Sequence, residues 1–341
     1  MFFFYESSLF ISNFIKFALK FIDTTKRMAP SSTNKTLIET VSRLSDSESL
    51  KGLFHQHQEG NPLPSGDALS EIIQLARGIL FPGYYGQSSV NRHTLPYHIG
   101  IDLERMHKLL CQQIMAGLCF ADEDCDDDKD CLDDDNCLQK KAREITNQLI
   151  ERLPEIRKIL ATDIEAAYNG DPAATNFGEI ISCYPVIKAL VNYRIAHELH
   201  ILGVPLIPRM ISELAHSETG IDIHPAATIG HHFTIDHGTG VVIGATCIIG
   251  DNVKLYQGVT LGALSFPLDE NGNPIKGIPR HPILEDDVIV YSNATILGRI
   301  TIGKGCVIGA NIWITENVAP NTKIYKSFRD NSGTNLNGYG I

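Results

Sequence analysis

The chain has 341 residues, 43% of them hydrophobic, and a formal net charge of −11 at pH 7. That length and hydrophobic content allow two domains with a sizeable core. Most of the negative charge is local, because residues 122–135 hold ten acidic residues and one lysine, which leaves a net charge of −2 for the remainder. No basic arm or patch is present, so the composition argues against a nucleic-acid-binding protein.

The first 22 residues are rich in Phe and Ile, but Asn13, Lys16 and Lys20 interrupt the apolar run. No basic segment precedes the run and no small-residue cleavage site follows it, which is unlike a secretory signal. The run is also too broken to span a membrane. We therefore expect residues 1–35 to be an N-terminal extension, disordered or helical. A true start at Met28 and a targeting peptide are the alternatives.

Residues 36–205 are predicted to form an α-helical domain, because apolar residues recur there at helical spacing. Asp67 is expected to cap a first helix that ends before Pro82, and Pro154 is expected to separate two later helices. A last helix should stop at Gly203. The apolar stripes comprise Ile72, Ile73, Leu75 and Ile79; Leu103, Met106, Leu110, Ile114 and Leu118; Ala142, Ile145, Leu149 and Leu153; Ile156, Leu160 and Ile164; and Val186, Leu190, Tyr193, Leu199 and Ile201.

An acidic segment over residues 121–137 interrupts this helical pattern. Asp126, Asp128 and Asp130 alternate as in a calcium-binding loop, but the glycine at the sixth position and the glutamate at the twelfth are missing. A solvated loop is therefore the prediction for this segment.

The eight cysteines of the chain form no C-x-x-C pair. Disulfide frameworks are typical of short secreted chains, and this chain is neither short nor clearly exported. We therefore expect reduced thiols and a cytoplasmic location.

Aliphatic residues six apart dominate the second half of the chain and predict a parallel β-helix over residues 206–326. Each six-residue unit forms one flat side, and three sides make a coil of about 18 residues. The pattern slips by two residues between Ile235 and Ile243. A β-sandwich with chance six-residue spacing is the alternative. The periodic residues are Ile223, Ile229, Ile235, Ile243, Ile249, Leu255, Leu261, Leu284, Val290, Ile296, Ile302, Ile308 and Ile314.

Two segments depart from the six-residue pattern. Residues 263–282 have no such phase and contain Asn271-Gly272-Asn273-Pro274, so we expect a loop that projects from the β-helix. Loops that leave a rigid solenoid usually carry function. Residues 327–341 are polar and should form a flexible C-terminal tail.

Clusters of Asp, His and Arg occur at the turns of the predicted β-helix. Asp222 and His237 are fifteen residues apart, slightly less than one coil, so adjacent coils would bring them close. A carboxylate beside an imidazole fixes its tautomer and raises its basicity, as general-base catalysis requires. Each of these residues, taken alone, is equally well explained as an ordinary turn residue of the β-helix. Together with the Arg280-His281 pair on the projecting loop, they favour a catalytic site.

These segments resemble a known family. IDIHPAATIG, followed by IDHGTGVVIGA, QGVTLGA and RHP, resembles the serine O-acetyltransferases, the left-handed β-helix enzymes that open cysteine synthesis. The likeness extends upstream to DPAA at 171–174 and YRIAH at 193–197, and downstream to Gly340-Ile341. It covers residues 165–320 closely and the helical domain loosely. The resemblance implies an α+β chain in which a helical domain precedes a left-handed parallel β-helix.

The resemblance also implies a role for each matched residue. His237 would be the base that deprotonates the serine hydroxyl, and Asp222 would orient it. The hydroxyl would attack the acetyl-CoA thioester directly, without an acyl-enzyme. Arg280 would take the serine carboxylate, and Asp171 and Asp236 would take the ammonium and hydroxyl side. The pocket would also include His281.

Further expectations concern acetyl-CoA and protein partners. Acetyl-CoA would lie in the groove between neighbouring β-helices, against Gly262, Ala263, Ser292 and Ala310, and no metal is expected. The family forms trimers, which the helical domains join into pairs, so a homotrimer or a dimer of trimers is expected. The tail that ends at Ile341 would dock onto O-acetylserine sulfhydrylase.

Some positions depart from the pattern of well-known family members. Ala245 stands where Glu is common, residues 261–266 replace a glycine-rich stretch, and the loop before Arg280 is longer. Three other functions are open: a sugar O-acetyltransferase, a zinc hydratase of the carbonic-anhydrase type, and a non-enzymatic scaffold. The residues that favour a zinc site are His231, His232, His237 and His281.

Overall fold

The computed structural model describes residues 32–46, 49, 63–86, 89–121, 131–325, 328–329 and 335–336, with the side chains of 32–33, 121, 131–136, 328–329 and 335–336 excepted. It has two compact units, residues 1–60 and 61–341. In the first unit, helix α2 (Ser32–Leu44) exposes Leu37, Ile38 and Val41. Within the described parts of the chain, no helix is both long and apolar enough to cross a membrane.

Several predictions fall largely outside the described residues. They are the extension 1–35, most of the acidic segment 121–137, and the tail with Ile341. Helix α5 begins at Cys131, inside the expected acidic loop. In the C-terminal segment, β15 (Phe328–Arg329) pairs antiparallel with β16 (Asn335–Leu336).

The second unit begins with helices that bury the predicted apolar stripes. In α4, Met106, Leu110 and Ile114 have no exposed surface. Helix α3 is capped by Ser65 and not by Asp67 as predicted, because the Ser65 hydroxyl accepts a hydrogen bond from the backbone N–H of Ala68. The helices are α3 (Gly66–Leu80), α4 (Leu95–Ala121), α5 (Cys131–Gly170), α6 (Phe177–Cys183), α7 (Pro185–Ile201) and α8 (Ile207–Thr219).

Helix α5 corrects the prediction that Pro154 separates two helices. It runs for 40 residues through Pro154. The buried positions keep one helical phase across the proline, with Leu149 and Leu153 before it and Ile156 after it, each at most 4% exposed. Proline in a helix interior costs about 3 kcal/mol. Burial of a continuous stripe offsets that cost, since each fully buried aliphatic side chain contributes about 1.5–3 kcal/mol.

The predicted boundary between helices and β-helix, at residue 206, is also wrong. Helix α8 follows it and the first strand starts at Asp222. The sequence holds both end signals of α8. Pro208 lies in the first turn, where its missing N–H costs nothing, and Gly220 ends the helix with φ 70°. The short helix α6 was likewise not predicted.

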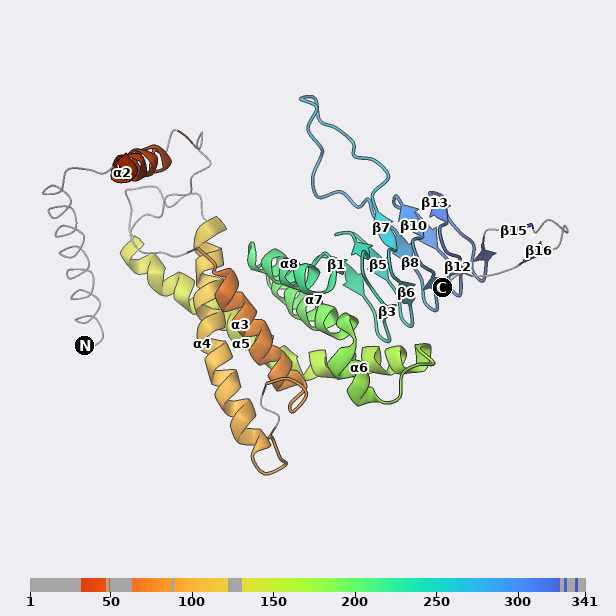
Figure 1. The fold of residues 1–341 in the computed structure, drawn as a ribbon, viewed down its shortest axis with the longest axis horizontal. Coiled ribbons are helices and arrows are strands. Elements are labelled where there is room, and N and C mark those ends of the chain that lie inside the picture. The colour runs from red at the N-terminus through yellow and green to blue at the C-terminus, as the bar shows by residue number, and fades with distance from the viewer. Residues whose placement is uncertain are drawn as a thin grey trace, which may run out of the picture. The chain divides into compact units, whose positions relative to one another are not determined.

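The rest of the unit is a parallel β-helix, as the six-residue spacing predicted (Figure 1). Most strands pair with the strand that comes three strands later along the chain. For example, Ile243 of β4 pairs with Leu261 of β7, and Leu261 pairs with Ile296 of β10. This is the architecture of the left-handed β-helix. Sheet 1 contains β1 (Asp222–Ile223), β4 (Val242–Ile243), β7 (Thr260–Gly262), β10 (Thr295–Leu297) and β13 (Trp313–Ile314). Sheet 2 contains β2 (Thr228–Ile229), β5 (Ile248–Ile249), β8 (Ile283–Leu284) and β11 (Thr301–Ile302). Sheet 3 contains β3 (Thr234–Asp236), β6 (Lys254–Tyr256), β9 (Ile289–Val290), β12 (Val307–Ile308) and β14 (Lys323–Ile324).

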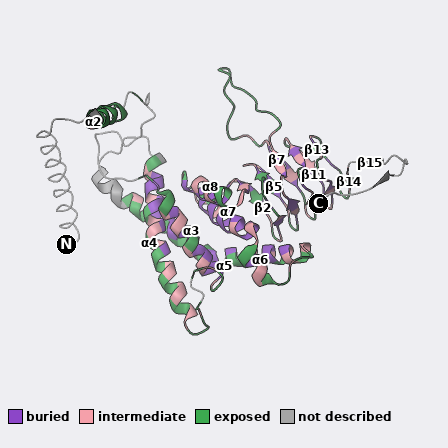
Figure 2. Cartoon of the chain, in the orientation of Figure 1, coloured by how far each residue is buried: buried purple, intermediate pink, exposed green. Residues whose placement is uncertain are grey.

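The periodic aliphatic residues form the core of this β-helix (Figure 2). All thirteen are at most 7% exposed. Residues 263–282 leave the β-helix after β7 as a projecting loop, as predicted, and return at β8 (Figure 1).

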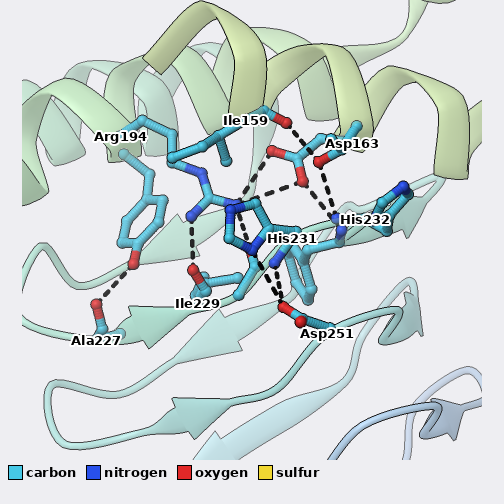
Figure 3. Close-up of polar contacts among 12 residues, drawn as sticks. Ile159, Asp163, Arg194, Ala227, Ile229, His231, His232 and Asp251 are labelled. Atoms are coloured by element: carbon cyan, nitrogen blue, oxygen red, sulfur yellow. Dashed lines mark hydrogen bonds and ion pairs between the residues drawn. The ribbon is translucent and has the colours of Figure 1, made fainter. Parts of the chain in front are cut away.

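A buried ion pair joins the helices to the first coil (Figure 3). Arg194 of α7 bonds Asp163 of α5 at 3.1 Å, and their side chains are 6% and 0% exposed. The same guanidinium donates to the carbonyls of Ile229 at 2.6 Å and Gly230 at 2.7 Å. Asp163 also accepts from the backbone N–H of Phe233 at 3.0 Å. These bonds fix α5, and with it the segment that follows Gly170, on the first coil.

Candidate active site

The turn between β3 and β4 carries His237 and is longer than its counterpart one coil later. Residues 237–241 separate these strands, whereas 257–259 separate β6 from β7. The two extra residues are the slip in the six-residue pattern. His237 has φ 58° and an exposed side chain. Gly238 has φ 82°, and a Cβ there would lie 2.5 Å from Ile221 Cδ1. We call residues 237–241 the histidine corner.

Asp171 lies near the histidine corner, just after the end of α5. Its carboxylate accepts hydrogen bonds from the Tyr184 hydroxyl at 2.5 Å and from the backbone N–H of Ala173 at 2.8 Å. These bonds, with the charges of Lys254 and His237, hold the pKa of Asp171 below its ordinary value. The same contact raises the pKa of Tyr184 to about 12. Asp171 is therefore an oriented anion within electrostatic reach of His237.

Lys254 lies between Asp236 and the end of α5, and the sequence analysis missed it. Its Nζ is 3.3 Å from Asp236 Oδ2 and donates to the Gly170 carbonyl at 2.6 Å. Burial lowers the pKa of Lys254, but contacts with Tyr256 and Asp236 outweigh that effect, so the pKa lies above its ordinary value. Asp236 and Lys254 are 18 residues apart, but the coil here has 20 residues, since Asp236 pairs with Tyr256 and Thr234 with Lys254. The regular spacing of the sequence therefore gave no direct signal for this contact.

Asp222 is on β1 beside β4, next to the histidine corner, but it does not bond His237 in this structure. Among the described residues, no hydrogen bond or ion pair joins the two side chains. Its carboxylate lies within 4.8 Å of Glu213 Oε and a His216 ring nitrogen. Arg209 donates to Glu213 at 2.6 Å, so a cation already occupies this cluster. The expected Asp222–His237 pair therefore stays a prediction.

Arg280 and His281 lie at the turn between sheets 1 and 2, where the projecting loop returns. The Thr246 hydroxyl accepts from the backbone N–H groups of Arg280 at 2.9 Å and His281 at 3.1 Å. The Thr246 N–H donates to His281 Nδ1 at 3.1 Å, which leaves the ring proton on Nε2. Burial, with the charges of Arg280 and Arg299, lowers the pKa of His281 to about 4. We call Thr246, Arg280 and His281 the arginine corner.

The Arg280 guanidinium has an unused donor. It lies over the Phe266 ring, with Cζ 5.7 Å from the ring centroid. Its Nε is buried without a hydrogen-bond partner among the residues that the structure describes. A buried donor without a partner costs about 1–3 kcal/mol, so an acceptor such as a ligand carboxylate would be stabilised there.

Sheet 1 separates the histidine corner from the arginine corner. Each side of the coil is about six residues, or roughly 20 Å at the rise of a β-strand. One serine molecule cannot touch both corners of a single chain. His231 and His232 lie at the third turn, between β2 and β3. The four histidines of the zinc alternative therefore do not converge within one chain.

Comparison with known proteins agrees with the fold and the motifs. No family model matches the chain. The chain is 49% identical over 257 residues to a protein of Synechococcus elongatus named "serine acetyltransferase, plasmid". The aligned residues make up 75% of this chain and 80% of that protein. The chain belongs to the serine acetyltransferase family. It is also 42% identical over 167 residues to the serine acetyltransferase of Bacillus pumilus, covering 49% of this chain and 73% of that one.

A solved structure of the same family supports the assignment. Serine acetyltransferase 1 of Entamoeba histolytica, in complex with L-cysteine, matches with a TM-score of 0.65 and 35% identity over 84% of this chain and 94% of that chain. The predicted resemblance and the predicted fold class are therefore confirmed.

The four residues expected to contact acetyl-CoA divide between the two ends of sheet 1. Gly262 and Ala263 lie where the projecting loop leaves β7, on the side of the arginine corner. Ser292 and Ala310 lie at the turns after β9 and β12, in the coils below the histidine corner. Ser292 is 4% exposed, and its carbonyl accepts from the N–H of Asn311 at 3.0 Å. They do not form one surface within a single chain.

Proposed function

We propose that this chain transfers the acetyl group of acetyl-CoA to the hydroxyl of L-serine, which yields O-acetyl-L-serine and CoA, the first step of cysteine synthesis. Its family membership and the charges of its two corners support this function. L-serine is a zwitterion. Asp171 and Asp236 offer negative charge to its ammonium, and the unpartnered Nε of Arg280 offers a donor to its carboxylate.

In the proposed reaction, His237 acts as the general base. Its imidazole takes the proton of the serine hydroxyl while the hydroxyl oxygen attacks the thioester carbonyl carbon. The C–O bond forms and the C–S bond breaks, and the resulting imidazolium returns the proton to the CoA thiolate. Asp222 would orient the imidazole in the complex, which requires the two side chains to come into contact when the substrates bind. No acyl-enzyme forms.

The separation of the two corners supports a site between two copies of the chain. One copy would contribute Asp171, Asp236 and His237, and its neighbour Arg280 and His281. The four residues expected at acetyl-CoA divide in the same way, so one groove between neighbours would use both sets. Three such head-to-tail interfaces close into a ring in a cyclic trimer. Both predicted assemblies, the homotrimer and the dimer of trimers, contain that ring.

A mixing experiment tests the proposed site. His237→Ala and Arg280→Ala should each be nearly inactive in a thiol-release assay with serine and acetyl-CoA. Subunits mixed at equal amounts, unfolded and refolded together, should regain activity at about one quarter of the sites, those with both intact halves. No recovery from refolded mixtures that form trimers would reject the shared site.

The acceptor is tested by comparing substrates in the same assay. A sugar has neither an ammonium nor a carboxylate, so Asp171, Asp236 and Arg280 would have no partner. Release of CoA with L-serine, and much less with homoserine or a galactoside, supports the amino-acid acceptor. Greater turnover of the galactoside would favour the sugar O-acetyltransferase.

L-cysteine should compete with serine, since it carries the same ammonium and carboxylate. The Entamoeba histolytica relative was solved with L-cysteine.

The tail ending at Ile341 is proposed to dock onto O-acetylserine sulfhydrylase, because a terminal carboxylate with an aliphatic side chain fits an amino-acid site. Deletion of Ile341 should abolish co-purification and leave acetyl transfer intact. A cytoplasmic location stays a prediction.

A further inference from the structure

Lys254 is an ionisable group near the histidine corner for which the proposed reaction has no role. Its side chain is 14% exposed, and it comes from the neighbouring strand β6. The Nζ contacts three groups: the Gly170 carbonyl, the Asp236 carboxylate and the Tyr256 ring, whose centroid is 4.5 Å away. The Tyr256 ring in turn stacks on Tyr291 at 4.8 Å. These contacts hold the ammonium in one place.

The charges around Lys254 add to a simple balance. Asp171 and Asp236 are two carboxylates near one corner, and the Lys254 charge acts on both of them. Lys254 neutralises one of them, which leaves a net charge of −1. A substrate ammonium would bring the group to neutrality. Oδ2 of Asp236 faces Lys254, and among the described residues Oδ1 has no hydrogen-bond donor, so one oxygen is free for a ligand.

The bond to Gly170 adds a geometric effect. Gly170 is the last residue of α5, and Asp171 follows it directly. The Lys254–Gly170 bond therefore spans from the β-helix to the segment that carries Asp171. A Cβ at Gly170 would lie 3.3 Å from Nζ, so the approach is close.

We propose that Lys254 is a positioning residue for the substrate ammonium, which neutralises Asp236 and ties Asp171 to the histidine corner. This proposal rests on the proposed function. It assigns Lys254 no part in the proton transfer. It distinguishes the two carboxylates, since Asp171 is oriented by Tyr184 and Ala173, whereas Asp236 is oriented by Lys254.

The test uses Lys254→Met, Lys254→Arg and a matched control, Lys323→Met, in the full chain. Lys323 is on β14 of the same sheet 3 and is exposed. Lys254→Met should raise KM for serine roughly tenfold or more, the size of one lost charged hydrogen bond, with KM for acetyl-CoA within about twofold. Lys323→Met should behave as the unchanged protein.

The pH profile separates positioning from a merely structural role. Without Lys254, Asp171 should lose one of the charges that lower its pKa and should hold a proton at higher pH. The acid limb of kcat/KM for serine should then move upward in Lys254→Met. Lys254→Arg keeps the positive charge and should restore the limb. A KM for serine that is unchanged or lower in Lys254→Met, or an acid limb that stays in place, would overturn the proposal.

Calorimetric titration of L-serine onto the unchanged protein shows whether the proposed function fails or only the role of Lys254 fails. Absence of both serine binding and serine turnover in the unchanged protein would defeat the proposed function, and the Lys254 proposal with it. Normal binding and turnover that Lys254→Met leaves unaltered would defeat the Lys254 proposal alone.

Discussion

Replacing Arg194 by Met should be among the most destabilising single substitutions in this chain. The guanidinium is 6% exposed and bonds the carboxylate of Asp163, which has no exposed surface. Its loss would leave Asp163 as an unpaired buried charge, which costs about 3–5 kcal/mol. Two carbonyls, of Ile229 and Gly230, would also lose donors, at about 1 kcal/mol each or more. We expect a loss of at least about 4 kcal/mol in the free energy of unfolding.

Urea unfolding followed by circular dichroism measures this loss. Arg194→Lys is the matched control, because lysine keeps the positive charge but lacks the rigid fork that bonds three acceptors. Its decrease in the free energy of unfolding should therefore be smaller than that of Arg194→Met. The double variant Asp163→Asn/Arg194→Met removes the buried charge, and the amide oxygen that it introduces can still accept from the Phe233 N–H. It should be more stable than Arg194→Met alone. The reasoning fails if Arg194→Met costs less than about 1 kcal/mol, or if the double variant is less stable than the single one.

Four further predictions concern the two corners. His237→Ala should lower kcat by roughly 10²–10⁴-fold while the urea midpoint stays unchanged, because the side chain is exposed; near-full activity would remove His237 from the mechanism. Arg280→Ala should raise KM for serine far more than KM for acetyl-CoA, and equal rises would indicate a disordered loop instead. Gly244→Ala should displace His281, whose ring would overlap the new Cβ, and so reduce kcat/KM for serine; full turnover would show that the ring adapts. Because the pKa of His281 is about 4 in the folded chain against 6.5 ordinarily, the unfolded chain takes up the proton first as pH falls. The free energy of unfolding should therefore decrease from pH 6.5 towards pH 4, and less steeply in His281→Gln; identical slopes would contradict the shift.

The sequence predicted the core of the β-helix well because its signal is local. Every coil repeats the same six-residue rule, so Ile296 or Ile308 can be assigned from its immediate neighbours. Helix α5 was misjudged for the opposite reason. A proline is a strong local signal, and only the burial of Leu153 and Ile156 against other elements shows that packing overrides it.

The site was only partly predictable from the sequence. Motifs identified Asp171, His237 and Arg280, but whether residues share a corner depends on which turns they occupy. The role of Lys254 depends on the strand register, which pairs Asp236 with Tyr256 across the sheet and sets Lys254 beside Thr234. Only the three-dimensional structure shows that the bond to Gly170 follows from this register.

The corners of this β-helix accept extra residues without disturbing its core. Two additional residues enter the histidine corner and a loop over residues 263–282 enters beside the arginine corner, yet Ile243, Leu261 and Ile296 still stack in one column. Strand pairing restores the alignment on the next side, so each corner can change length independently. Acceptor preference could therefore be redesigned by exchanging corner segments while every core position is kept, a separation of stability from selectivity that a tightly interlocked domain does not offer.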